Sequence, residues 1–210
     1  LAGDRLAVGG QLISVRGLAG TYDEVYLPLY GGHQGANAAL ALAAVESLIG
    51  GGAQPIGRDV VAEGLGQATS PGRLQLIGVE PTTIVDAAHN PHGARSLAVA
   101  LDEVFDFDEW GLVFGAFADK DVEGIVAALA PAVARVFATP LHSERAASTG
   151  ELARRTRAAG LETTAHADLF DALTAAREWA GESPRRAVVV AGSVVLAGEA
   201  IALAVDEGWK

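Results

Sequence analysis

The stretch TTIVDAAHNPHG, residues 82–93, decides the fold because it changes from one type of secondary structure to another within a few residues. Residues 82–86 have the β-branched, apolar character of a buried strand. A short polar loop follows, and Pro91 stands where a helix begins, since proline is favoured in the first helical turn. A strand that leads through a tight loop into a helix is the repeating unit of α/β folds, so this stretch predicts that class.

The same order of elements repeats from this stretch to the end of the chain. A strand precedes it at 73–79, and further strands are expected at 112–117, 135–139, 162–165 and 187–191. Helices are expected at 91–105, 122–129, 150–159, 168–179 and 194–205. This alternation predicts a mostly parallel, Rossmann-like sheet with helices on both faces.

The N-terminal part has a different pattern. Gly9-Gly10 predicts a hairpin turn, and a strand is expected at 25–29. An Ala- and Leu-rich helix is expected from His33 to Ile49, apolar almost all round and therefore buried, with a short helix at 58–66.

These elements are too few for a core of their own. We therefore place a domain boundary at Ser70-Pro71-Gly72. Residues 1–69 are expected to be the remnant of one domain, and residues 70–210 a complete α/β domain.

Composition and charge exclude several classes of protein. Half of the residues are hydrophobic and 20% are charged, as in ordinary globular proteins. The formal net charge of −11 argues against non-specific binding to nucleic acid or anionic membranes. The absence of cysteine excludes disulfides and thiolate chemistry. With no apolar run near the ~18 residues of a membrane span and no signal segment, we expect a cytoplasmic protein without membrane partners.

The chain contains no methionine and begins at Leu1. An initiator methionine is normally removed only before a small residue, so we expect the chain to be a piece of a longer polypeptide. Any function inferred from it is then part of a larger one.

The strongest candidate site is the loop at the end of the 82–86 strand. Ligands of open α/β sheets bind at the carboxyl ends of strands, where Asp86, His89 and Asn90 precede a helix N-terminus. An acid, an imidazole and a carboxamide there could bind an anionic ligand. Alternatively, Asp86 and Asn90 are capping groups and His89 packs against the loop.

Four further residues have both a binding and a structural interpretation. Lys120 could neutralise a phosphate or carboxylate, or belong to a solvated first turn capped by Asp121. Ser193 could bind a carboxylate or cap the last helix. Arg73 could clamp a phosphate or form a surface ion pair, and Asn37 could bind a ligand base or satisfy nearby backbone.

Two common site types are missing from the sequence. It contains no Gly-x-x-x-x-Gly-Lys-Ser/Thr phosphate loop and no Gly-x-Gly-x-x-Gly after a strand. Its five histidines are scattered, so we assign no metal ligand in this chain.

Several sequence blocks occur together in one order. GHQGANAALA (32–41), SPGRLQ (70–75), DAAHNPHG (86–93), DKD (119–121) and AGSVVLAG (191–198) resemble the folylpolyglutamate synthase/dihydrofolate synthase family of the Mur ligase superfamily. The Asp-x-Ala-His-Asn-Pro block is the most specific of these. The resemblance spans nearly the whole chain and favours a functional interpretation of Asp86 and His89.

The resemblance implies an ATP-dependent ligase that forms an acyl phosphate, which the amine of L-glutamate then attacks. It implies that residues 1–69 end a central ATP-binding domain and that residues 70–210 form a Mur-ligase-type C-terminal domain. Its cofactors would be ATP and Mg²⁺, with the metal ligands and phosphate loop upstream of this chain. Folate or dihydropteroate would be the acceptor, the full-length enzyme would be a monomer, and this chain alone would be inactive.

The resemblance also implies roles for individual residues. Asn37, Arg73 and Asp86 would contact the nucleotide. His89 and Ser193 would line the glutamate site, and His89 and Lys120 would take part in catalysis.

Two other interpretations remain open. The chain could come from a Mur-type cell-wall peptide ligase, although the HQGANA and PGRLQ blocks look more like the folate enzymes. It could also be a non-catalytic nucleotide-binding module. The presence of a phosphate loop upstream in the same reading frame would distinguish the ligases from the module.

Overall fold

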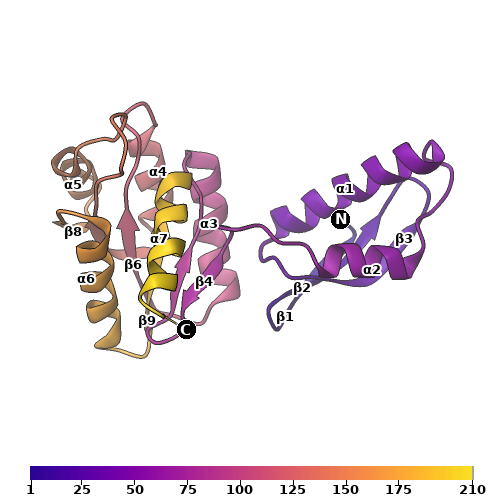
Figure 1. Ribbon diagram of the computed structural model, residues 1–210, viewed down its shortest axis with the longest axis horizontal. Coiled ribbons are helices and arrows are strands. Elements are labelled where there is room, and N and C mark those ends of the chain that lie inside the picture. Colours follow the sequence, from indigo (N-terminus) through magenta and orange to yellow (C-terminus); the bar gives the residue numbers. More distant parts are fainter. Residues whose placement is uncertain (210) are drawn as a thin grey trace. The chain divides into compact units, whose positions relative to one another are not determined.

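The computed structural model of the protein describes residues 1–209 (Figure 1). The chain divides after Pro71 into two compact units, which we call unit 1 and unit 2. The division falls inside the Ser70-Pro71-Gly72 segment, and unit 1 is two residues longer than the expected 1–69. No helix within the described residues is both long and apolar enough to cross a membrane.

Unit 1 contains a three-stranded antiparallel sheet and two helices. The strands are β1 (Gly3–Ala7), β2 (Gly10–Arg16) and β3 (Thr21–Leu27), and the helices are α1 (Gly32–Gly50) and α2 (Arg58–Gly66). Ala7 pairs with Gly10, so Val8 and Gly9 form the hairpin turn, one residue earlier than expected. Gly9 has φ +78°, a conformation that glycine adopts readily, which explains its place in the turn.

The prediction that the N-terminal part lacks its own core is wrong. Apolar side chains from β2, β3 and both helices form one buried cluster. Its fully or nearly fully buried members are Ile13, Val15, Tyr22, Val25, Leu27, Ala38, Leu42 and Val61. A three-stranded antiparallel sheet packed on two helices therefore suffices to bury these side chains.

The prediction that α1 is buried all round is also wrong. Leu42 faces the core and is 6% exposed, whereas Leu40 and Leu48 are 71% and 86% exposed within the chain. Composition records how apolar the helix is, but only the packing of unit 1 decides which face is covered. One side of α1 is thus an exposed apolar surface.

Glu46 is a buried acid on α1 and anchors the segment before β3. Its carboxylate is 0% exposed and accepts hydrogen bonds from the hydroxyl of Tyr22 (2.7 Å) and from the backbone N–H groups of Leu18 and Ala19. The Tyr22 hydrogen bond and these N–H groups hold the pKa of Glu46 below its ordinary value, against the opposing effect of burial. The charge is therefore compensated inside the unit.

Unit 2 is built on a six-stranded sheet with the order β4-β5-β9-β6-β7-β8. The strands are β4 (Gln75–Gly78), β5 (Thr83–Val85), β6 (Glu109–Phe114), β7 (Val133–Ala138), β8 (Glu162–Ala165) and β9 (Arg186–Ala191). Only β4 runs antiparallel to its neighbour, and the other pairs are parallel. The predicted fold class is confirmed.

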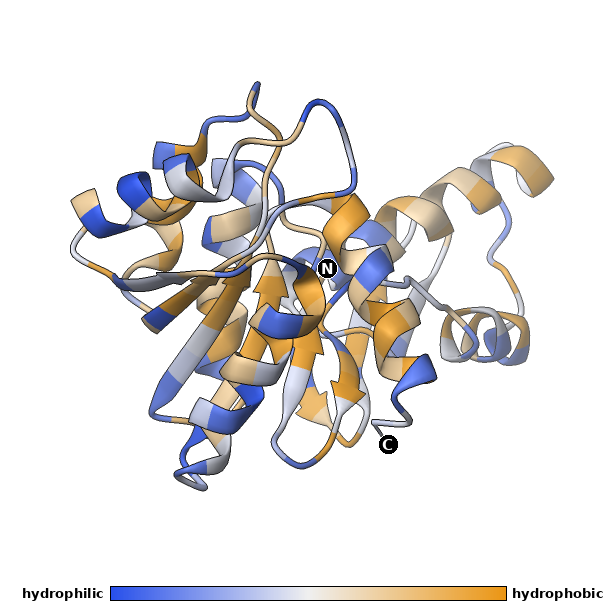
Figure 2. Ribbon diagram, turned by 60° about the vertical axis from the view of Figure 1, so that its left-hand side comes forward, coloured by the Kyte–Doolittle hydropathy of each residue, from blue (hydrophilic) through white to orange (hydrophobic). Residues whose placement is uncertain are grey.

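Helices cover both faces of this sheet. Three helices, α3 (Pro91–Val104), α4 (Val122–Leu129) and α5 (Thr149–Ala158), pack side by side on one face. The other face carries α6 (Leu169–Gly181) and α7 (Val194–Asp206). Figure 2 shows the apolar strands between these layers, and the central strand β9 is buried from Ala187 to Ala191.

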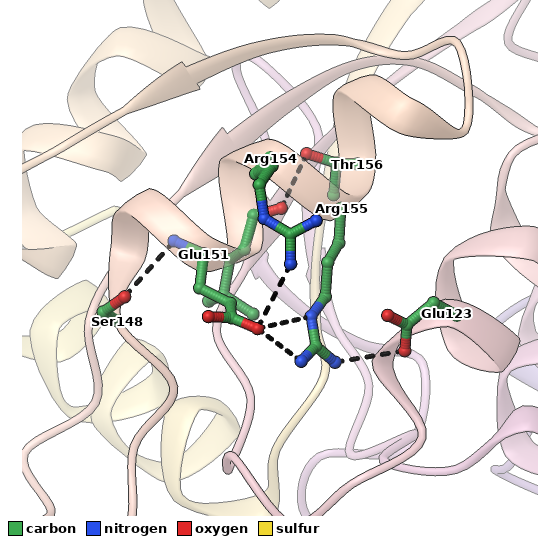
Figure 3. Close-up of polar contacts among 7 residues, drawn as sticks. Glu123, Ser148, Glu151, Arg154, Arg155 and Thr156 are labelled. Carbon is green, nitrogen blue, oxygen red and sulfur yellow. Dashed lines mark hydrogen bonds and ion pairs between the residues drawn. The ribbon is translucent and has the colours of Figure 1, made fainter.

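Helices α4 and α5 are also joined by an ion-pair cluster on the surface (Figure 3). Arg155 donates to Glu151 on its own helix and to Glu123 on α4, and Arg154 also contacts Glu151. Two cations thus face two carboxylates, so the cluster carries no net charge.

Candidate functional site

Three loops meet at the carboxyl edge of the unit 2 sheet. They follow β5, β9 and β6, which are neighbours in the sheet. The backbone N–H of Gly192 donates to the carbonyl oxygen of Ala88 (2.9 Å). A Cβ atom at Gly192 would lie 2.6 Å from the carbonyl oxygen of Gly115, so only glycine allows this approach. Asp86, His89, Ser193 and Lys120 therefore belong to adjoining loops.

Asp86 ties the entry of β4 to the loop after β5. One carboxylate oxygen accepts from the backbone N–H of Leu74 (3.1 Å), and the other accepts from Ala88 (2.8 Å). Asp86 is only 6% exposed. Asp86 therefore does not cap a helix, since Asn90 is the N-cap of α3; its carboxylate instead joins two segments of backbone.

His89 and Asn90 occupy the turn between β5 and α3. His89 is partly buried, and its Nδ1 lies 2.9 Å from the carbonyl oxygen of Ala87. Because a carbonyl only accepts, Nδ1 carries the proton, and in the neutral ring Nε2 has a free lone pair. Asn90 caps α3 by accepting from the backbone N–H of Gly93 (2.8 Å), as in the structural interpretation.

Ser193 is the N-cap of α7. Its hydroxyl accepts from the backbone N–H of Val195 (3.1 Å), and the residue is 0% exposed. The cap interpretation is therefore correct for this structure. The side chain orders the first turn of α7, whose N-terminal N–H groups begin at the meeting point of the three loops.

Lys120 lies in the loop after β6. Its ammonium is 3.8 Å from the carboxylate of Asp119, and the neighbouring Asp121 caps α4 by accepting from the N–H of Gly124 (2.9 Å). A Cβ atom on Gly124 would approach Pro91 to 2.7 Å, so the first turn of α4 lies against the start of α3. The helix that follows the Lys120 loop therefore starts beside the helix that follows the His89 loop.

Arg145 joins this group, and sequence analysis missed it. Its guanidinium donates to Asp119 (3.0 Å), and this hydrogen bond holds the pKa of the Asp119 carboxyl below its ordinary value. Arg145 follows β7 and Asp119 follows β6, and the two strands are parallel neighbours. Arg145 could have been identified from the adjacency of β6 and β7, but not from any spacing along the chain.

Arg73 and Asn37 were expected at the nucleotide. Arg73 is exposed and lies between two residues that hydrogen-bond the loop after β5: Gly72 accepts from Ala87 (2.7 Å), and Leu74 donates to Asp86. Arg73 therefore lies at the carboxyl edge of the unit 2 sheet. Asn37 lies in unit 1, exposed on α1, where it donates to Gln34 (3.2 Å).

Within residues 1–209, no group of three or more histidine, aspartate or glutamate side chains is arranged to hold a metal ion.

Comparisons with known proteins agree with this architecture. The chain is 42% identical over 210 residues to the dihydrofolate synthase/folylpolyglutamate synthase of Mycobacterium tuberculosis, covering 93% of this chain and 43% of the relative. The solved structure of Mycobacterium tuberculosis folylpolyglutamate synthase complexed with ADP matches with a TM-score of 0.91 at 40% identity, over 96% of this chain and 46% of that chain.

A third match bears on the small molecules of the family. A bifunctional folylpolyglutamate synthase/dihydrofolate synthase with Mn, AMPPNP and L-glutamate bound has a TM-score of 0.73 at 31% identity, over 88% of this chain and 42% of that chain. The chain thus spans less than half the length of the relatives it matches. The profile of the Mur ligase glutamate ligase domain matches residues 72–194, more than half of the chain, and the chain therefore belongs to the Mur ligase family.

Proposed function

We propose that this chain is the C-terminal part of an ATP-dependent ligase that adds L-glutamate to folate and to dihydropteroate. The observation that carries the proposal is the 42% identity to a dihydrofolate synthase/folylpolyglutamate synthase over 93% of the chain. This similarity extends over both units and includes the three loops at the carboxyl edge of the sheet. The relative bound to L-glutamate supports the choice of amino acid.

The proposed reaction has two steps. An acceptor carboxylate oxygen attacks the terminal phosphorus of ATP, which gives an acyl phosphate and ADP. The free amine of glutamate then attacks the acyl carbon, phosphate leaves, and the nitrogen loses a proton as the amide forms. Catalysis of such transfers relies on positioning the reactants and on stabilising negative charge.

The residues of unit 2 divide between the two reactants in this proposal. Asp86 and Arg73, near the β4 edge, contact the nucleotide from the C-terminal side. His89 presents the Nε2 lone pair to the amino-acid substrate, and Ser193 orders the helix N-terminus that lines the same pocket. Lys120 neutralises negative charge that develops as the acyl phosphate is attacked.

The rest of the proposal concerns the longer protein. Residues 1–69 belong to the ATP-binding domain, with Asn37 on the adenine side of the nucleotide. Mg²⁺ is held by residues of the longer protein that lie outside this chain. The complete enzyme is a cytoplasmic monomer that acts on small molecules and binds no nucleic acid.

A chimaeric enzyme tests the proposal. This chain would replace the matching segment of the Mycobacterium tuberculosis relative, and ADP release would be measured with dihydropteroate or a reduced folate, with and without L-glutamate. We expect turnover that requires both acceptor and glutamate, and none from the 210-residue chain alone. A chimaera that folds, as judged by gel filtration and tryptophan fluorescence, yet shows no such turnover would overturn the proposal.

Substitution of His89 tests the division of roles within that chimaera. We expect His89→Ala to raise the apparent KM for glutamate by about tenfold and to change that for ATP much less, since a lost polar contact to a charged ligand is worth roughly 1.5 kcal/mol. Equal changes in both apparent affinities would contradict the placement of His89 in the glutamate pocket.

A further inference from the structure

Asp119, Lys120 and Arg145 form an ion-pair cluster that contains two cations and one carboxylate. Arg145 contacts one oxygen of Asp119 and Lys120 approaches the other. By contrast, Arg185 and Arg186 each face two carboxylates, and Arg154 and Arg155 together face two. Two cations thus share the single carboxylate of Asp119, while Asp121 and Glu144 adjoin them along the chain.

Arg145 is held in place by three independent contacts. The loops after β6 and β7 pair at an isolated bridge between Phe117 and Ala146, and the N–H of Ala118 donates to the carbonyl of Arg145 (2.9 Å). The guanidinium stacks 5.0 Å from the centre of the Phe117 ring and also donates to Asp119. A side chain restrained in this way loses little conformational entropy when it binds a ligand.

The guanidinium retains unused binding capacity. It has five N–H donors, and among the described residues Asp119 is the one side chain that accepts from it. Its side chain is 68% exposed, so the remaining donors reach solvent. A planar, positively charged fork of donors fits a carboxylate.

The order of the strands indicates which carboxylate of the amino-acid substrate would face Arg145. The loops can be followed across the sheet, starting from the β4 edge. Arg73 and Asp86 lie first, beside β4 and β5. Ser193 follows β9, Lys120 follows β6, and Arg145 follows β7. The groups proposed for the nucleotide thus lie at the end of this series opposite Arg145. In the proposed function the amino-acid substrate would lie between these ends, with its amine toward the acyl phosphate and its side chain toward β7.

We propose that Arg145, positioned by Asp119 and Phe117, binds the side-chain carboxylate of the incoming amino acid and makes the site selective for glutamate over glutamine. This inference rests on the proposed function. Glutamine has the same length but offers a neutral amide, which cannot form a charged pair with the guanidinium. Discrimination between the two amino acids therefore isolates this contact from the rest of the pocket.

Binding of L-glutamate and L-glutamine to the 210-residue chain, followed by NMR titration, tests the inference. We expect the wild type to bind glutamate at least about tenfold more tightly, from the strength of hydrogen bonds to charged groups. Arg145→Ala should weaken glutamate binding about tenfold and change glutamine binding by less than about twofold. Arg145→Lys keeps the charge and loses the planar fork, so its glutamate affinity should lie between those of the wild type and Arg145→Ala.

Arg154→Ala is the matched control, because Arg154 has the same 68% exposure and lies on α5 in the balanced cluster of Figure 3. It should leave both affinities unchanged. If Arg145→Ala weakens glutamate and glutamine binding equally, or if it weakens the binding of neither amino acid, the inference fails and the proposed function stands. If the wild type binds no glutamate, the proposed glutamate pocket fails and the inference fails with it.

Discussion

The carboxylate of Asp86 accepts a hydrogen bond from the backbone N–H of Leu74 at 3.1 Å, across the start of β4 and the end of β5. Leu74 has φ +46°, an uncommon conformation for leucine. The hydrogen bond from its N–H to Asp86 is made in this conformation. Its neighbour Arg73 is thereby held at the carboxyl edge of the sheet. Asp86 thus holds the start of β4 against the loop after β5.

We predict that Asp86→Ala lowers the stability of unit 2 by about 2–4 kcal/mol. The substitution leaves the buried N–H groups of Leu74 and Ala88 without the carboxylate oxygens that they bind, at roughly 1–3 kcal/mol each. Urea denaturation followed by tryptophan fluorescence measures this change, because Trp110, Trp179 and Trp209 all lie in unit 2.

Asp86→Asn is the control for this prediction, since its one carbonyl oxygen can still accept. We expect it to lose about half as much stability as Asp86→Ala. An unchanged urea midpoint for Asp86→Ala would show that the two hydrogen bonds do not support the fold.

The N-caps Ser193 and Ser148 form a natural pair for comparison. Each hydroxyl accepts a hydrogen bond in the first turn of its helix, Ser193 on α7 and Ser148 on α5 (Figure 3). Replacement by alanine should cost about 1 kcal/mol in either case. In the titration with L-glutamate, Ser193→Ala should weaken binding and Ser148→Ala should not. Equal glutamate affinities in the two variants would remove α7 from the proposed pocket.

The arrangement of unit 2 could be predicted because it depends on local patterns. Helix 122–129 and strand 162–165 lie where they were expected, since turns and apolar periodicity mark their ends. The pairing of Arg145 with Asp119 could not be predicted in this way. The residues are 26 positions apart, and only the adjacency of β6 and β7 brings them together.

The two errors in unit 1 have a common physical origin. Hydropathy along a segment measures the free energy of burying its side chains, but it does not show which other segments cover them. The helix α1 was therefore expected to be buried, and the hairpin was not expected to complete a core. Both outcomes depend on how β2 and β3 pack against Leu42 and Val61.

Substitutions on α1 test which of its faces is covered. Leu48→Lys should change the stability of unit 1 by less than about 0.5 kcal/mol, because the side chain is 86% exposed. Leu42→Ala should cost about 2–4 kcal/mol, because that side chain is in the core. Near-UV circular dichroism of tyrosine reports on this unit, since Tyr22, Tyr26 and Tyr30 all lie in it. Similar losses in both variants would mean that the exposed face is covered in solution.

The buried Glu46 should make the stability of unit 1 depend on acid pH. Hydrogen bonds from Tyr22, Leu18 and Ala19 lower its pKa in the folded state below the ordinary value of 4.5. A lowered folded pKa means that the carboxylate stabilises the fold above pH 4.5, and that this contribution is lost as the pH falls through the folded pKa.

Glu46→Gln separates this contribution from the general effects of acid. The variant should melt at a lower temperature than the wild type at pH 7, because its NH₂ group cannot accept the bonds that a carboxylate oxygen accepts. Below pH 4.5, where the wild type loses its advantage, the two melting temperatures should converge. Glu63→Gln, an exposed change on α2, should follow the wild type throughout. A constant difference between wild type and Glu46→Gln from pH 7 to pH 3 would contradict the prediction, because it would mean that the protonation state of Glu46 does not matter to the fold.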